Sequence, residues 1–144
     1  MEPITKLKVN EALEDVRQEL SPLYNLMQSV LPSMYERNWG RFIAISLEPS
    51  YSSPAYAYNV AKAARSHAVL LAAEQAWKHG VTMNVICPGP VASIETLEAA
   101  IEQCENSESR KNRKKVTPQD IGETVAFLCS DVGKFITGCI VPFK

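Results

Sequence analysis

Two short apolar segments with a long alanine-rich segment between them constrain the fold more than any other feature of the sequence. Residues 41–47 (RFIAISL) and 81–87 (VTMNVIC) are rich in strand formers, as is typical of strands buried on both faces of a parallel sheet. Between them, residues 55–78 contain many alanines, which favours a closely packed helix, and His79-Gly80 is a typical helix end. This order predicts a strand–helix–strand unit with parallel strands.

The flanking segments extend this unit at both ends. Residues 10–36 place leucine, valine and methionine at helical spacing, and Thr117-Pro118 is a typical helix start. We expect a third strand over residues 135–143. The length suits one domain, so the sequence predicts a single α/β domain over residues 1–144, with about three parallel strands and flanking helices. Such a sheet would leave an apolar edge open, which another part of the sheet or a partner would cover.

Composition and charge exclude several classes of function. The formal net charge is −1, so nothing draws the whole chain to nucleic acid, and the basic cluster in residues 110–115 is expected to be a solvated loop after a short helix at residues 94–104. No apolar run is long enough to span a membrane. The first residues show no signal-peptide pattern, which predicts a cytoplasmic protein.

The cysteines do not form a metal-binding pattern. None of the four lies in a C-x-x-C pair, and the sequence has two histidines, so no zinc site is expected. Cys87, Cys129 and Cys139 lie in apolar strand or helix patterns, which predicts buried thiols.

Tyr58 and Lys62 are the best candidates for a chemical role. They lie four residues apart near the start of the predicted helix 55–78, so both side chains project from one face. An ammonium group beside a phenol favours the phenolate, and such a tyrosine can exchange a proton with a carbonyl or hydroxyl oxygen. Taken alone, the spacing is also compatible with an incidental surface pair.

The segments around this pair resemble the short-chain dehydrogenase/reductase family, in particular its 3-oxoacyl-carrier-protein-reductase-like members. Tyr58-Asn59-Val60-Ala61-Lys62 matches the Tyr-x-x-x-Lys motif of that family. The other matching segments, in the family's order over about residues 15–141, are Leu31-Pro32-x-Met34, Gly40-Arg41-Phe42-Ile43-Ala44-Ile45-Ser46, Asn84-Val85-Ile86-Cys87-Pro88-Gly89, Thr117-Pro118-Gln119-Asp120 and Ile136-Thr137-Gly138. The resemblance implies the C-terminal half of a Rossmann-like doubly wound parallel sheet.

The resemblance also implies roles for individual residues. Tyr58 would be the general acid/base, and Lys62 would assist it and hold the ribose hydroxyls of NAD or NADP. The substrate would be a small molecule carrying a carbonyl or an alcohol. Further cofactor contacts are implied at Pro88, Gly89, Val91 and Ser93.

The sequence departs from the family pattern in three places. Leu47 stands where the catalytic serine is usual, so the neighbouring Ser46 is the candidate, with Ser50, Ser52 and Ser53 as looser ones. Glu19 aligns with the family's helix asparagine and is a candidate partner for Lys62. No two of the six glycines are close enough to form the Gly-rich turn that approaches a cofactor pyrophosphate.

Two functions therefore remain open. The first is an oxidoreductase subunit that acts together with a separate N-terminal-half chain, and the second is a catalytically inactive structural or regulatory remnant of the family. The resemblance also implies a homo-oligomer that associates through the helices 10–36 and 55–78, whose apolar and alanine-rich faces suit that use.

Overall fold

The elements follow the predicted order of helices and strands. In the computed structural model, residues 4–47, 56–89, 91, 98 and 116–143 are described. Their elements are η1 (Ile4–Lys6), α1 (Val9–Glu36), β1 (Gly40–Ile45), α2 (Tyr56–Ala76), η2 (Trp77–His79), β2 (Val81–Cys87), α5 (Pro118–Cys129), η3 (Asp131–Phe135) and β3 (Ile140–Pro142). The predicted helix 94–104 and loop 105–115 lie outside the described residues.

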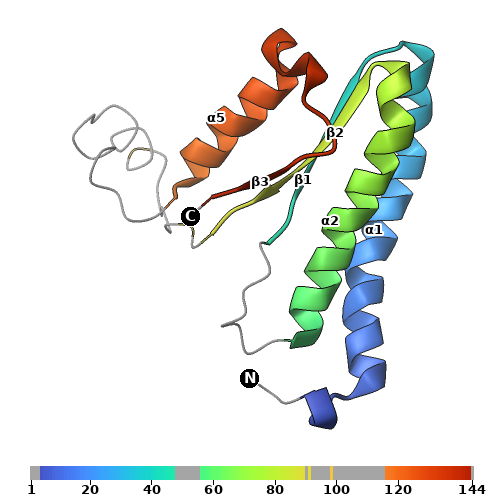
Figure 1. The fold of residues 1–144 in the computed structure, drawn as a ribbon, viewed down its shortest axis with the longest axis vertical. Helices are drawn as coiled ribbons and strands as arrows, with labels where there is room; N and C mark the ends of the chain where they lie inside the picture. Colours follow the sequence, from blue (N-terminus) through green and yellow to red (C-terminus); the bar gives the residue numbers. More distant parts are fainter. Residues whose placement is uncertain (1–3, 48–55, 90, 92–97, 99–115, 144) are drawn as a thin grey trace.

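The three strands form one parallel sheet in the order β1-β2-β3. Gly40 of β1 pairs with Val81 of β2, and Val85 of β2 pairs with Ile140 of β3. The helices α1 and α2 lie on one side of the sheet and α5 on the other (Figure 1). The predicted α/β architecture, about three parallel strands with flanking helices, is confirmed.

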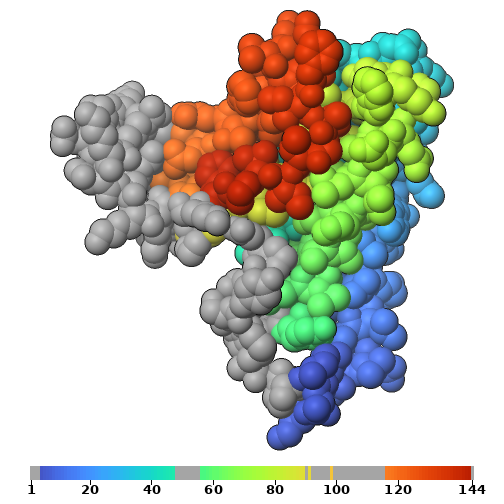
Figure 2. Space-filling model, viewed as in Figure 1, coloured from blue at the N-terminus to red at the C-terminus, as the bar shows by residue number. Residues whose placement is uncertain are grey.

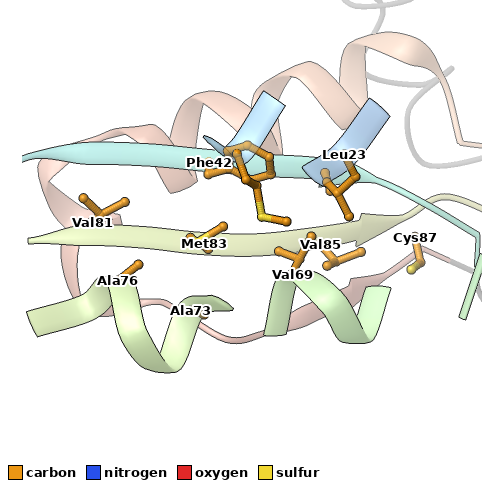
Figure 3. Close-up of a cluster of buried hydrophobic side chains, with 11 residues drawn as sticks. Leu23, Phe42, Val69, Ala73, Ala76, Val81, Met83, Val85 and Cys87 are labelled. Carbon is orange, nitrogen blue, oxygen red and sulfur yellow. The ribbon is translucent and has the colours of Figure 1, made fainter. Parts of the chain in front are cut away.

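The core lies between β2 and the two long helices. Alternate residues of β2, including Met83 and Val85, point toward α2, where Val69, Ala73 and Ala76 are buried (Figure 3). Small side chains at these helix positions let α2 approach the sheet closely. Phe42 of β1 with Leu23 and Met27 of α1 completes the cluster. The expected burial on both faces is confirmed for β2, whose residues are all buried, but was wrong for β1, where buried residues alternate with half-buried ones and Ile45 is exposed.

The turn that follows α2 is fixed by a glycine. Gly80 has a φ of 69°, in the left-handed region that glycine adopts without strain. A Cβ atom at Gly80 would collide with the carbonyl oxygen of Asn38, so the two turns that precede β1 and β2 lie close together. The predicted helix end at His79-Gly80 is confirmed, and the last turn is a 3-10 helix.

The bounds predicted for the third strand were wrong. Residues 135–143 were expected to form one strand, but a 3-10 helix ends at Phe135 and β3 covers Ile140–Pro142. Gly138, with a φ of 68°, bends the chain just before the strand. The apolar stretch at residues 135–143 is therefore longer than the strand β3 that it contains.

Side chains connect the residues before β3 to β2. The amide of Asn84 donates to the carbonyl of Ile136 at 2.8 Å and accepts from the backbone N–H of Cys139 at 3.1 Å. The backbone N–H of Met83 donates to Oγ1 of Thr137 at 3.0 Å. These bonds satisfy groups that a longer backbone ladder would otherwise pair.

The thiols differ from the prediction at two of three positions. Cys87 is buried in β2, as expected, but Cys129 and Cys139 are exposed. Cys129 ends α5, one position after the buried Leu128, and Cys139 precedes a strand at the edge of the sheet. Within the described residues, no helix has the length and apolar character needed to cross a membrane.

Candidate active site

The candidate residues gather where the parallel strands end. Ser46 directly follows β1, and Pro88 and Gly89 directly follow β2. The helix α2 runs back along the sheet, so its first turns, which carry Tyr58, lie toward this same end (Figure 1). Clefts beyond the carboxyl ends of strands are the usual ligand sites of open parallel sheets.

Tyr58 and Lys62 meet on the surface of α2. The ammonium nitrogen of Lys62 lies 5.2 Å from the centroid of the Tyr58 ring. The tyrosine is 44% exposed, whereas the lysine side chain is 15% exposed. A cation at this distance interacts favourably with an aromatic ring. The arrangement therefore presents a phenol to solution with a largely buried positive charge beside it.

Glu19 of α1 binds the same lysine. Lys62 Nζ lies 2.7 Å from Glu19 Oε1, and Arg65 Nη1 lies 3.0 Å from Glu19 Oε2. Burial raises the pKa of the Glu19 carboxyl, but the hydrogen bonds and charges of the two cations outweigh it and hold this pKa below its ordinary value. Glu19 is therefore an ionised carboxylate that two cations share, as the sequence predicted for Lys62.

Ser46 contacts the backbone of α2. Its hydroxyl donates to the carbonyl oxygen of Lys62 at 3.2 Å, and the hydroxyl of Ser66 lies 2.9 Å from Ser46 Oγ and 3.1 Å from the same carbonyl. Ser46 is buried because it shares the helix-facing side of its strand with Phe42 and Ala44. These contacts hold the backbone of Lys62 against the sheet. The catalytic role of Ser46 stays a prediction.

The residues after β2 lie close to the end of the third strand. Pro88 is buried, and a Cβ atom at Gly89 would lie 2.8 Å from the carbonyl oxygen of Phe143. Val91 is 39% exposed and forms a parallel bridge with Val116. Ser93, Ser50, Ser52 and Ser53 lie outside the described residues.

Two residues of the site were not predicted from the sequence. Arg65 and Ser66 follow Lys62 by three and four positions, the spacing that places side chains on one helix face. This spacing was a usable signal for their nearness to Lys62. Nothing in the local pattern indicated that Arg65 would bind Glu19, which lies 46 positions earlier in the sequence.

Comparison with known protein families shows to which family this chain belongs. The family model described as enoyl-(acyl carrier protein) reductase matches residues 1–143. This chain belongs to the short-chain dehydrogenase/reductase family. Among curated relatives, nodulation protein G of Azospirillum brasilense is 36% identical over 124 residues, which are 83% of this chain and 50% of that protein. The acetoacetyl-CoA reductase of Allochromatium vinosum is 30% identical, with 96% of this chain and 60% of the relative covered.

Solved structures of similar fold agree with this membership. The TT0495 protein of Thermus thermophilus superposes with a TM-score of 0.74 at 25% identity, covering 99% of this chain and 63% of that one. Halohydrin dehalogenase has a TM-score of 0.75 at 23% identity, a likeness that shows the fold alone. The chain thus spans about half to three fifths of the length of the curated short-chain dehydrogenase/reductase relatives described above. Its fold does not select one reaction, because function depends on the site that a fold carries.

Proposed function

We propose that this chain is the catalytic portion of an NAD(P)-dependent oxidoreductase that reduces a carbonyl or oxidises an alcohol on a small molecule. The observation that carries the proposal is the exposed Tyr58 with the ammonium of Lys62 over its ring, at the carboxyl edge of a parallel sheet. The relatives support it, since one of them is an acetoacetyl-CoA reductase and another is a 3-oxoacyl-(acyl-carrier-protein) reductase.

In the proposed mechanism, Tyr58 moves the proton. In the direction of reduction, its hydroxyl donates a proton to the carbonyl oxygen of the substrate, and in the direction of oxidation its phenolate accepts one. The positive charge of Lys62 stabilises the phenolate that remains after donation. A nicotinamide, when bound, supplies or accepts the hydride. Ser46 would assist at the substrate oxygen only after leaving the carbonyl of Lys62.

The residues present fit one end of a nicotinamide dinucleotide. Tyr58 and Lys62 offer a hydroxyl and an ammonium group, which suit ribose hydroxyls, and Pro88 and Gly89 stand at the end of β2 where a ring would lie beside backbone. These 144 residues contain no Gly-rich turn that could bind the pyrophosphate of the cofactor. That contact, and with it the choice between NAD and NADP, would come from a separate N-terminal-half chain or segment.

Two surfaces suit the proposed partners. An apolar groove of about 560 Å³ runs between α1 and α2, and its lining residues are Tyr24, Met27, Gln28, Leu31, Pro32, Tyr35 and Ala72. A second copy of the chain would cover this groove in a homo-oligomer. The outer edge of β1 is free of a strand among the described residues, and it would receive the N-terminal half. A cytoplasmic location belongs to the same proposal.

Nucleotide binding tests the proposal. The chain is titrated with NADH and NADPH, alone and with a candidate N-terminal-half chain, and binding is followed by nicotinamide fluorescence. We expect binding in the assembled pair. If neither nucleotide binds in either preparation, the proposal is wrong.

A matched pair of variants tests the role of Tyr58. Tyr56 lies on the same helix turn and is also 44% exposed. In the assembled pair, Tyr58→Phe should lower turnover by about 10²–10⁴-fold, the usual contribution of a general acid/base, with nucleotide binding retained. Tyr56→Phe should leave turnover within about twofold. Equal activity of the two variants would favour the inactive remnant.

A further inference from the structure

The lysine beside Tyr58 belongs to a cluster of three charges. Lys62 and Arg65 of α2 bind the two oxygens of one carboxylate, that of Glu19 on α1. The side chains are 15%, 29% and 18% exposed, so they lie partly out of water. Electrostatic interactions are stronger there than at an open surface. The cluster therefore holds two cations and one anion next to a phenol.

The geometry divides the carboxylate between the two cations. Oε1 of Glu19 lies 2.7 Å from the ammonium of Lys62, and Oε2 lies 3.0 Å from the guanidinium of Arg65. Without Glu19, the positive charges of Lys62 and Arg65 would act on Tyr58 with no negative charge of this carboxylate to offset them. Without Arg65, the whole carboxylate would be available to Lys62.

We propose that Glu19 and Arg65 are positioning residues that set how much of the Lys62 charge acts on Tyr58. Glu19 draws the ammonium toward α1 and offsets its charge, while Arg65 occupies part of the carboxylate and limits that offset. The catalytic meaning of this balance rests on the proposed function, but the balance itself is a property of this chain.

The elements packed against this part of α2 carry further titratable groups. Asp15 lies one turn before Glu19 on α1, and β2 brings the buried thiol of Cys87. β1 contributes the uncharged hydroxyl of Ser46, which is bound to the backbone of α2. Glu19, Lys62 and Arg65 are the charged groups that contacts tie to this phenol, through the ammonium of Lys62 over its ring.

Two substitutions should move this ionisation in opposite directions. Glu19→Gln removes the anion and leaves both cations, so the phenolate of Tyr58 should form at a pH lower by about half to one unit. Arg65→Met removes a cation and frees the carboxylate for Lys62, so the phenolate should form at a higher pH by a similar amount.

The experiment is a pH titration of the 144-residue chain labelled with ¹³C in its tyrosine rings and followed by NMR. Tyr58→Phe identifies the signal of Tyr58 among the five tyrosines of the sequence. Glu14→Gln is the matched control, because Glu14 lies on the same helix and pairs with the exposed Arg17. It should leave the midpoint unchanged, and Glu19→Asp, which keeps the charge, should stay close to the parent chain. Circular dichroism at neutral pH verifies that each variant is folded.

Opposite shifts for Glu19→Gln and Arg65→Met would support the proposal. Unchanged midpoints in both folded variants, or shifts in the same direction, would overturn it. A purely structural role gives no reason for the two substitutions to shift the midpoint in opposite directions. If one variant does not fold, the other still decides, because a midpoint that moves in its expected direction supports the proposal and an unchanged midpoint overturns it. The result does not depend on nucleotide binding, so this proposal and the proposed function can fail separately.

Discussion

The two faces of the sheet are closed in different ways. On the face toward α1 and α2, apolar side chains interdigitate, and Met83 and Val85 of β2 are fully buried. On the other face, within the described residues, α5, a helix of 12 residues, lies against the sheet. The space-filling view shows the α5 and η3 region standing beside the long helices (Figure 2).

Large apolar side chains remain exposed around the face that carries α5. Ile45 at the end of β1 is 43% exposed, Phe127 of α5 is 47% exposed and Phe135 of η3 is 88% exposed. The face toward α1 and α2 is therefore closed by apolar packing, whereas large apolar side chains stay exposed around α5 and at the end of β1.

The largest expected effect is on the face that is closed. Met83→Ala removes a fully buried side chain between β2 and the helices, so it should lower the free energy of unfolding by about 2–5 kcal/mol. Phe135→Ala should change it by less than about 0.5 kcal/mol, since this ring is exposed. Urea unfolding followed by circular dichroism measures both. Similar losses in the two variants would contradict the distinction between the faces.

The next effect concerns the polar connections at β3. Asn84→Ala removes both hydrogen bonds of a buried amide and leaves the carbonyl of Ile136 and the N–H of Cys139 without that partner. The expected loss of stability is about 2–4 kcal/mol. Thr137→Val removes one bond to Met83 and should cost about half as much. Equal costs in urea unfolding would mean that packing, and not hydrogen bonding, holds this segment.

The same chemical change at two glycines should have opposite signs. Gly80→Ala places a Cβ in a left-handed conformation and against the carbonyl of Asn38, so it should destabilise the chain by about 1–3 kcal/mol. Gly122 lies in α5, and a Cβ added there would meet nothing within 4 Å, so Gly122→Ala should stabilise the chain by about 0.5–1 kcal/mol. Thermal unfolding midpoints compare the two. A destabilised Gly122→Ala variant would show that α5 is packed more tightly than its exposure indicates.

The smallest effect is the acid response of the charged cluster between α1 and α2. The folded state lowers the pKa of Glu19, so the resulting stability is present above the ordinary glutamate pKa of about 4.3 and is lost as the pH falls below it. As the pH falls from about 5 to 3, the parent chain should therefore lose more stability than Glu19→Gln. Urea unfolding at both pH values measures the difference. Parallel losses in the two proteins would assign the acid response to other carboxylates.

Local patterns predicted those parts of the fold that depend on neighbouring residues. Apolar spacing located α1, β1 and β2, and Thr117-Pro118 was recognised as a helix start, where the structure has a reciprocal capping box between Thr117 and Asp120. The last strand was drawn too long because the hydropathy of residues 136–139 does not reveal that side chains make part of their pairing to β2.

The site was predictable to a similar extent. The spacing of Tyr58 and Lys62 follows from the helix period, and the structure brings them together. The link between Glu19 and Arg65 joins two helices, and the orientation of Ser46 depends on which face of β1 meets α2. Both depend on how distant elements pack, which one sequence pattern does not encode.

The side-chain bonds of Asn84 and Thr137 have a consequence for alignment between strands. The backbone ladder repeats every two residues, so backbone pairing alone is compatible with a slip of two residues, whereas an amide and a hydroxyl at fixed positions have partners at one offset alone. β3 is thereby locked lengthwise against β2, and Phe143 arrives beside Gly89. The last described residues thus fix the point at which Gly89 leaves the sheet, at the strand end where the candidate site lies.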